Sequence, residues 1–266
     1  MTKAGYLGPA GSYCEIAARA MCKEAELIPY ANFHLTVNAL LSGETQAAVL
    51  PIENTINGAV RQNIDLLQMH EELCAVSEYT VKIDHRFFTL AGADKSKVNR
   101  IYSHTQALDQ CSAFIAKNYP YAVTVAADST SGALDKIKSE AEAAIAGAQC
   151  VREGLDMSDE CISDEKNNYT HFLKVVKGGI PEGFVSTKVF ISLTCPNVPG
   201  GLLKLLNIIY SYNLNMAEIE SRPIKDKVGE YRFFIELEAD YSSMATQKAL
   251  NELKNATNSF RVLGCY

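Results

Sequence analysis

Hydroxyl and amide side chains recur at turns that lead into predicted helices, and a group of such turns can bind an anion. The residues concerned are Ser12 with Glu15, Ser103 with Gln106, Asn54 with Thr55, and the run from Ser129 to Ser131. The first two pairs fit the capping box, in which both side chains satisfy backbone N–H groups at a helix start. Helix N-termini carry free N–H groups and a partial positive charge, which favour a negative ligand. Four such turns therefore predict a cleft for a small anionic substrate, although each turn alone is more often an ordinary helix cap than a ligand contact.

Composition excludes other classes of ligand and location. The 266 residues carry a formal net charge of -6 without a basic stripe, which argues against nucleic acid as a partner. The segment GPAGS is not a G-x-G-x-x-G fingerprint and no GK[ST] motif occurs, so nucleotide binding has no support. Neither a signal peptide nor an apolar run of membrane-spanning length is present, so we expect a cytoplasmic protein without a membrane partner.

The eight cysteines are scattered along the chain without a C-x-x-C pair. We expect reduced, mostly buried thiols, as is usual in a reducing cytoplasm. A zinc site needs clustered ligands, so no metal site is predicted.

Short apolar strands alternate with helical patterns through the first half of the chain. The expected strand–helix pairs are 4–8 with 13–25, 46–52 with 60–70, 98–103 with 106–118, 123–130 with 131–141, and 142–147 with 148–155. This alternation is typical of a mainly parallel α/β sheet. The number of pairs favours two α/β lobes with a cleft between them.

A glycine-rich linker at 178–186 separates this region from a different pattern. The remaining elements are a strand at 188–194, a loop at 195–200, a helix at 201–213, strands at 215–223 and 231–239 joined by a turn at 224–230, a helix at 243–257 and a strand at 259–265. This βαββαβ order predicts a ferredoxin-like domain. The expected domains are 1–180 and 187–266.

Seven segments, in order along the chain, resemble the prephenate dehydratase family. The catalytic segments are GPAGSYCEIAA (8–18), VLPIENTINGAV (49–60), IYSHTQALDQC (101–111), ADSTSGA (127–133) and NNYTHF (167–172). PGGLLKLL (199–206) and IESRP (219–223) resemble the two phenylalanine-binding motifs of the ACT regulatory domain. The resemblance implies a two-lobed, periplasmic-binding-protein-like catalytic domain followed by an ACT domain.

The resemblance implies a lyase that converts prephenate to phenylpyruvate, CO2 and water in phenylalanine biosynthesis, without a cofactor. It makes Thr170 the proton donor to the departing ring hydroxyl. Asn54, Ser103 and Gln110 would bind or orient the substrate, and the shell around it would contain Ser12, Thr55, Ser129, Thr130 and Asn168. Aromatisation drives the reaction, so one placed proton donor among hydroxyls and amides is enough.

The chain departs from the family at His171, because the family motif is Thr-Arg-Phe. An arginine offers a carboxylate a permanent, bidentate charge, whereas a histidine is charged only part of the time near neutral pH. If the family's arginine helps to hold a substrate carboxylate, this protein needs another cation or binds its substrate more weakly; the candidate cations are Arg61, Lys82, Arg86 and Arg152. Thr105 also replaces a family proline. His85 and His104 have no partnered nucleophile, so a direct acid or base role is not expected for either.

By the same resemblance, phenylalanine would bind the ACT domain as a feedback effector. The expected contacts are Gly200, Gly201, Leu202, Asn215, Glu220, Ser221, Arg222 and Pro223. Glu220 and Arg222 alternate with Ser221, so they share one face of a strand. Because ACT domains pair around the effector, a homodimer or homotetramer is expected.

Two alternatives remain open at this point. One is a relative that dehydrates arogenate or decarboxylates prephenate without aromatising it. The other is a catalytically silent sensor of amino acids. His171 motivates both of them.

Overall fold

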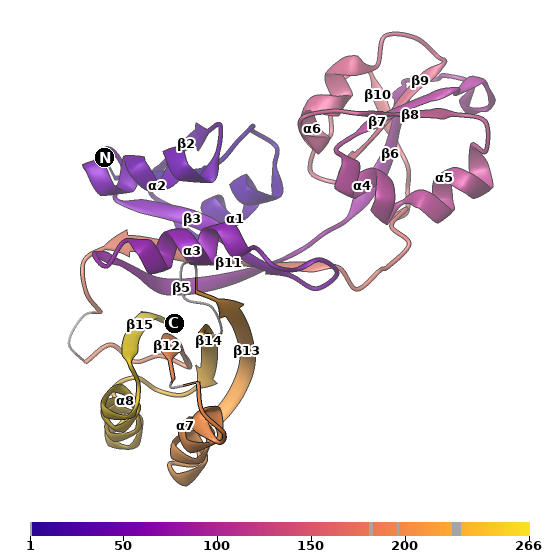
Figure 1. Ribbon diagram of the computed structural model, residues 1–266. Helices are drawn as coiled ribbons and strands as arrows, with labels where there is room; N and C mark the ends of the chain where they lie inside the picture. Colours follow the sequence, from indigo (N-terminus) through magenta and orange to yellow (C-terminus); the bar gives the residue numbers. More distant parts are fainter. Residues whose placement is uncertain (1, 181–182, 196, 225–229) are drawn as a thin grey trace. The chain divides into compact units, whose positions relative to one another are not determined.

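The computed structural model describes residues 2–180, 183–195, 197–224 and 230–266. Within these ranges the chain divides into two compact units: residues 2–63 with Tyr79–Phe172, and Ile64–Glu78 with the residues from Leu173 to Tyr266. Figure 1 labels their helices and strands. Residues 181–182 of the expected linker, Pro196 of the expected loop and 225–229 of the expected turn lie outside the described residues. No described helix has the length and apolar character needed to cross a membrane.

The first sheet of the first unit contains β1 (Lys3–Leu7) between β2 (Glu26–Tyr30) and β3 (Ala47–Asn54), and β1 is parallel to both. The apolar run at the start of β3 is buried throughout, as is typical of a parallel strand covered on both faces. Helices α1 (Tyr13–Met21) and α2 (Phe33–Ser42) connect these strands. The short strand β4 (Gly58–Ala59) turns back along the end of β3.

The second sheet of this unit has the order β10 (Leu155–Met157), β6 (His85–Leu90), β9 (Glu142–Gly147), β7 (Arg100–Ser103) and β8 (Val123–Ala126). β7 is parallel to β8 and β9, whereas β6 is antiparallel to β9 and β10. Phe87 and Phe88 point to opposite sides of the sheet and belong to different apolar clusters. The helices are α4 (Thr105–Gln110), α5 (Ser112–Asn118) and α6 (Thr130–Ala133), with 3-10 turns η1 (Lys95–Lys97) and η2 (Leu134–Lys136).

The prediction of a helix at 148–155 is wrong. These residues form turns and the first residue of β10, and Gly154 has a left-handed φ of 81°. A helix cannot pass through that conformation, and the chain must instead reverse to pair β10 with β6.

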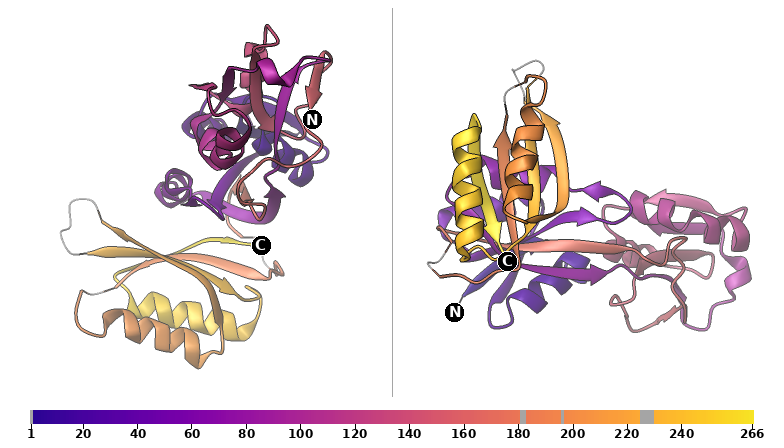
Figure 2. Two further views of the ribbon diagram at one scale, coloured as in Figure 1. Left: turned by 90° about the vertical axis from the view of Figure 1, so that its right-hand side faces the viewer. Right: turned by 90° about the horizontal axis from the view of Figure 1, so that it is seen from below.

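The second unit contains the expected βαββαβ arrangement, which the structure confirms. Its elements are β12 (Lys188–Thr194), α7 (Gly201–Ser211), β13 (Asn215–Pro223), β14 (Tyr231–Glu238), α8 (Met244–Ala256) and β15 (Ser259–Cys265). The sheet order is β13-β14-β12-β15, with antiparallel pairs. Figure 2 shows both helices on one face of this sheet.

Two strands have residues in both units: β5 (Leu73–Lys82) and β11 (Tyr169–Lys177). In the second unit, β15 pairs in parallel with β5 where Gly264 lies opposite Ala75. A Cβ atom on Gly264 would lie 2.4 Å from the Ala75 Cβ and 2.6 Å from its carbonyl oxygen. This close approach of the two backbones therefore requires glycine at position 264.

Helix α3 (Arg61–Met69) follows the turn after β3, and Arg261 of β15 holds its C-terminal end. The Arg261 guanidinium donates hydrogen bonds to the carbonyl oxygens of Leu67, Gln68, His70 and Leu73 at 2.7 to 2.9 Å. Carbonyl groups at the end of a helix lack partners within the helix, and a cation there also meets the negative end of the helix dipole.

Candidate active site

A pocket of about 420 Å³ lies in the first unit, near the ends of β1, β3 and β8 and the starts of α1, α4 and α6. Binding sites of open α/β sheets form at such strand ends. Its polar lining includes Asn54, Gln110 and Thr170. Its apolar lining includes Phe33, Pro51, Val60, Ile83 and Phe172. The pocket therefore combines a few polar groups with a largely apolar wall, as is usual for small-molecule sites.

A chain of amide side chains runs behind the polar wall. Asn54 Nδ2 donates to Asn168 Oδ1 at 2.7 Å, and Asn168 Nδ2 donates to Gln110 Oε1 at 3.1 Å. His85 Nε2 lies 3.1 Å from the same Gln110 oxygen. Asn54, His85 and Asn168 are nearly or fully buried, so these bonds are shielded from water. The side chains are therefore held in fixed orientations.

Thr170 lies at the pocket end of this chain. Asn54 Nδ2 also donates to Thr170 Oγ1 at 3.0 Å and to the carbonyl oxygen of Tyr169 at 3.0 Å. Asn54 itself is fixed because its Oδ1 accepts the backbone N–H groups of Ile56 and Asn57 at 3.2 and 3.1 Å. The Thr170 oxygen is therefore a hydrogen-bond acceptor from Asn54, and its O–H can donate to a molecule in the pocket.

His85 packs against Tyr13 in an edge-to-face arrangement, with ring centroids 6.0 Å apart. Tyr13 is held in turn by the backbone of Asp84, because its hydroxyl donates to the carbonyl at 2.9 Å and accepts from the N–H at 3.1 Å. Burial lowers the pKa of His85, although its hydrogen bond to Gln110 acts in the opposite direction. Burial therefore favours the neutral form of the His85 imidazole.

The charges around the pocket come from few groups. Among its described lining residues, the titratable side chains are those of Tyr13, Cys14, His85, His104 and Asp128, and none is lysine or arginine. The first turn of α1 contributes Ser12, Tyr13 and Cys14, so the positive end of that helix dipole lies at the wall. Burial raises the pKa of the Cys14 thiol to about 12, so it is not a thiolate nucleophile at neutral pH.

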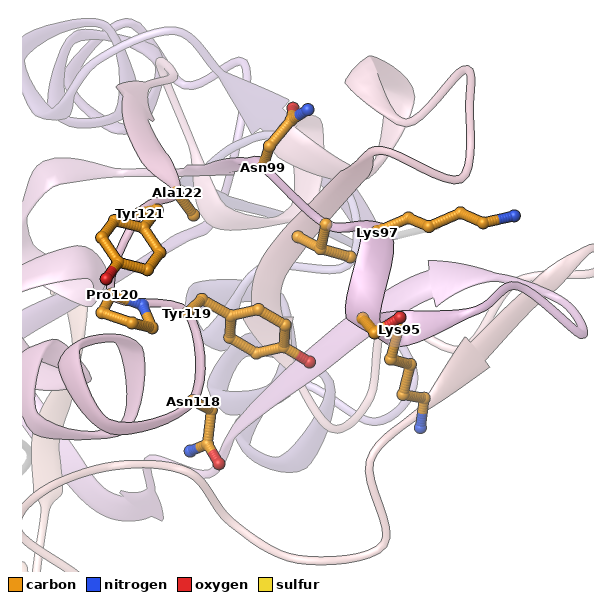
Figure 3. Close-up of a pocket in the computed structure, with 10 residues that line it drawn as sticks. Lys95, Lys97, Asn99, Asn118, Tyr119, Pro120, Tyr121 and Ala122 are labelled. Atoms are coloured by element: carbon orange, nitrogen blue, oxygen red, sulfur yellow. The ribbon is translucent and has the colours of Figure 1, made fainter.

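A second hollow of the first unit has a volume of about 460 Å³ and is shown in Figure 3. It is lined by η1 and by the segment from Asn118 to Ala122, with Lys95 and Lys97 at its edge. Lys97 is paired with Glu140 at 2.8 Å on the surface. None of the residues expected to do chemistry lines this hollow.

In the second unit, the Glu220-Ser221-Arg222-Pro223 segment lies on β13. Arg222 pairs with Glu220 at 2.7 Å and with Asp65 of α3 at 2.6 Å, and its guanidinium lies 4.7 Å from the Phe234 ring centroid. Glu220 and Arg222 therefore share one strand face, as their alternation predicts. Gly200 has a left-handed φ of 80° immediately before α7.

Comparison with known proteins assigns the family. The family model described as prephenate dehydratase matches residues 4–179, and the one described as ACT domain matches residues 189–255. The bifunctional chorismate mutase/prephenate dehydratase of Escherichia coli (strain K12) is 35% identical over 270 residues, covering 98% of this chain and 69% of that protein. The prephenate dehydratase of Lactococcus lactis subsp. cremoris (strain MG1363) is 34% identical over 272 residues, covering 99% and 97%. This chain belongs to the prephenate dehydratase family.

A solved structure supports the same assignment. Prephenate dehydratase from Arthrobacter aurescens, in complex with L-Phe, has a TM-score of 0.89 and 29% identity, covering 100% of this chain and 90% of that one. The expected family, its two-part α/β and ACT fold, and the carbon–oxygen lyase reaction are thus confirmed. The roles of individual residues in this prephenate dehydratase stay predictions.

Most residues expected at the site lie together, but not all reach the pocket. The pocket lining contains Asn54, Gln110, Thr170, Ser12, Ser129 and Thr130. Asn168 lies directly behind it, in the amide chain. Ser103 is buried and donates instead to the carbonyl oxygen of Ile145 at 2.6 Å, and Thr55 bonds the backbone of Asn167 and Tyr169.

His171 is not among the lining residues, although its neighbours Thr170 and Phe172 are. Successive side chains of a strand point to opposite faces, so position 171 of β11 faces away from the pocket. Its Nδ1 lies 2.8 Å from Thr80 Oγ1. The histidine that stands in place of the family arginine therefore does not contribute to the described lining of the pocket.

The four replacement cations do not line the pocket either. Arg86 pairs with Asp84 at 2.7 Å, which holds the pKa of that carboxyl below its usual range. Arg152 pairs with Asp135 and donates to the Ser131 carbonyl at 3.3 Å. These two arginines are thus engaged in the protein's own structure.

Sequence reasoning missed the roles of Tyr13 and Ile83 and gave His85 no place in the site. His85 and Gln110 are 25 residues apart, so only the tertiary structure brings them together. The signal available in the sequence was the alternation of Val81, Ile83 and His85 with the charged residues Lys82 and Asp84, which is typical of a strand with one buried face.

Proposed function

We propose that Thr170 is the proton donor of this prephenate dehydratase and that Asn54 orients it. The observation that carries the proposal is the 3.0 Å hydrogen bond from Asn54 Nδ2 to Thr170 Oγ1 at the pocket wall. A fixed donor on the oxygen directs the O–H outwards and stabilises negative charge that develops on that oxygen. Free threonine is a poor acid, so this stabilisation is what proton donation at Thr170 needs.

The reaction balances with one proton. The bond between the prephenate ring and its carboxylate breaks, and its electron pair enters the ring as CO2 forms. The C–O bond at the opposite ring carbon breaks, and the departing oxygen takes the proton from Thr170 to leave as water. Thr170 recovers a proton from solvent when the products leave. Aromatisation drives these steps, so the residues mainly supply orientation and local charge stabilisation.

Prephenate has two carboxylates, one that leaves as CO2 and one that keeps its charge, and the pocket lining offers a different environment to each. A strong ion pair to the carboxylate that becomes CO2 would stabilise the substrate more than the transition state, which slows the reaction. The apolar wall of Phe33, Val60 and Phe172 imposes no such pair. The other carboxylate keeps its charge, and the N-terminal end of α1 offers it favourable N–H groups.

Activity tests the proposal directly. The protein is incubated with prephenate, and phenylpyruvate is followed by its absorbance. We expect Thr170→Ala to lower kcat by about 100-fold or more, which is the usual contribution of general acid catalysis. Thr124→Ala is the matched control, because Thr124 is an exposed threonine of β8 outside the pocket. Equal activity in both variants would exclude Thr170 as the donor.

Phenylalanine is the proposed effector of the second unit, with residues 187–266 as the regulatory domain and 1–180 as the catalytic domain. The Arthrobacter aurescens relative is described in complex with L-Phe, and the Glu220–Arg222 pair offers charged groups for an amino acid. The contacts remain those expected from Gly200, Gly201, Leu202, Asn215, Glu220, Ser221, Arg222 and Pro223. Calorimetry with phenylalanine tests binding, and Arg222→Ala should abolish it.

The proposal extends to the oligomeric state, the cellular location and the substrate preference of the protein. We expect a homodimer or homotetramer, which light scattering with and without phenylalanine distinguishes. A cytoplasmic location is supported by the eight cysteines, all of which are free thiols. Comparing kcat/KM for prephenate and arogenate tests substrate preference, and the position of His171 away from the pocket supports prephenate. A protein that binds phenylalanine but turns over neither substrate would be a sensor.

A further inference from the structure

We propose that His85 is a positioning residue: as a neutral imidazole with its proton on Nε2, it fixes the orientation of Gln110 at the pocket wall. The inference rests on the proposed site around Thr170. Its geometrical basis is the chain of hydrogen bonds that joins Thr170, Asn54, Asn168, Gln110 and His85.

Backbone N–H groups at Asn54 determine which atom donates and which accepts in each of these hydrogen bonds. Asn54 Oδ1 accepts two backbone N–H groups, those of Ile56 and Asn57, so the oxygen and nitrogen of this amide cannot exchange places. Asn54 Nδ2 must then donate to Asn168, which makes the atom it meets Oδ1. The remaining amide group of Asn168 is Nδ2, which donates to Gln110 Oε1.

The same direction determines the protonation of His85. Because Gln110 presents its oxygen to Asn168, it presents the same oxygen to His85 Nε2 at 3.1 Å. An imidazole nitrogen without a proton would place two acceptors against each other. His85 Nε2 must therefore carry the proton and donate.

The second ring nitrogen shows why His85 stays neutral. Nδ1 is buried and has no hydrogen-bond partner among the described residues. A proton there would create a buried charge without a partner. The charged groups nearest in sequence, Asp84 and Arg86, are paired with each other, and the Tyr13 ring packs against the imidazole in an edge-to-face arrangement. Both ring nitrogens are thus unsuited to proton exchange with a ligand, which separates positioning from direct acid–base catalysis.

The consequence for catalysis lies at Gln110. With Oε1 held by His85 and Asn168, its Nε2 group is directed away from the amide chain and lies 3.4 Å from Asn57 Oδ1. Gln110 lines the pocket, so one N–H of this group is available to the substrate. Without the His85 donor, the Gln110 side chain loses one of the two hydrogen bonds at Oε1, and the bonds with Asn168 and Asn57 remain.

Two variants separate the hydrogen bond from packing. His85→Leu removes the donor, and we expect kcat on prephenate to fall by roughly tenfold to 100-fold, because small misplacement of orienting groups has effects of that size. His85→Gln can still donate from its amide nitrogen, so it should recover most of that loss. Thermal unfolding of both variants checks that they are folded. Wild-type kcat in folded His85→Leu, or equal loss in the two variants, would overturn the proposal.

The tautomer can be measured without turnover. In protein labelled with 15N-histidine, the ring nitrogens of His85 should show a proton on Nε2 and none on Nδ1 at neutral pH. The signals are assigned by their loss in His85→Gln. A proton on Nδ1, or a doubly protonated ring, would refute the proposed orientation even if Thr170 is the proton donor. Conversely, an active Thr170→Ala variant would refute the donor role and leave the tautomer result standing.

Discussion

Replacing Asn54 by Asp changes one atom of the amide and reverses its hydrogen bonding. Asn54 Nδ2 has three acceptors within 3.0 Å: Asn168 Oδ1, the Tyr169 carbonyl oxygen and Thr170 Oγ1. In Asn54→Asp, a carboxylate oxygen replaces Nδ2 and faces all three acceptor oxygens. No proton lies between the new oxygen and Asn168 Oδ1 or the Tyr169 carbonyl oxygen. The Thr170 hydroxyl then donates to the new carboxylate, so it no longer donates to the substrate.

The expected size of this effect follows from the number of bonds and their burial. Removing one donor to a developing negative charge typically lowers kcat by about 100- to 1,000-fold, or about 2.7–4 kcal/mol. Asn54 is 7% exposed, so the new carboxylate also lacks hydration. We expect the free energy of unfolding to fall by about 2–4 kcal/mol, because a buried acceptor is left unpaired beside a charge.

Burial and three neighbouring oxygens raise the pKa of the new carboxyl in the folded state. The folded variant then binds more protons than the unfolded chain at pH values between the two pKa values. Its stability therefore rises as the pH falls from the raised folded pKa towards the ordinary value of about 3.9.

The assay is turnover of prephenate at saturating substrate, together with urea unfolding at several pH values. Asn118→Asp is the matched control, because Asn118 lies in the second hollow and a carboxylate there would be close to solvent. An Asn54→Asp variant with kcat within about threefold of wild type would contradict the reasoning, because the donor would then contribute less than one ordinary hydrogen bond.

Other predictions concern the elements around the site. Arg261→Met removes all four bonds to carbonyl oxygens in the α3–β5 segment, so we expect urea unfolding to show a loss of about 2–4 kcal/mol; an unchanged midpoint would contradict it. Gly264→Ala forces a Cβ against Ala75 and should cost about 1–3 kcal/mol in the same measurement, with wild-type stability as the opposing result. His171→Arg should leave kcat/KM on prephenate within about threefold of wild type, because the side chain faces Thr80; a larger rise would place residue 171 in the substrate site.

The local features of the fold could be predicted where short-range chemistry determines them. At α1 the Ser12 side of the capping box forms, because Ser12 accepts from Glu15 N, whereas the Glu15 carboxylate accepts the N–H of Gly11, one residue before the cap, at 2.6 Å. The second expected box shifts by one residue, because β7 includes Ser103 and His104 becomes the cap of α4. Where a strand ends depends on its partners, which the sequence pattern does not specify.

The site could be predicted only in part, for a similar reason. Asn54, Gln110 and Thr170 were recognised from segments that resemble the family, and the structure brings them to one pocket. The place of His85 depends on the register of β6 against β9 and on the position of α4, which no local pattern encodes. The orientation of His171 was available from the alternation of Thr170 and Phe172 along one strand.

The measurement that tests the central claim most directly compares Thr170→Ser with Thr170→Val on prephenate. Serine keeps the hydroxyl and loses the methyl group, whereas valine keeps the β-branched shape and loses the hydroxyl. We expect Thr170→Ser to retain kcat within about tenfold of wild type and Thr170→Val to lose about 100-fold or more, with both variants folded. Comparable kcat values for the two variants would show that the hydroxyl does not donate the proton.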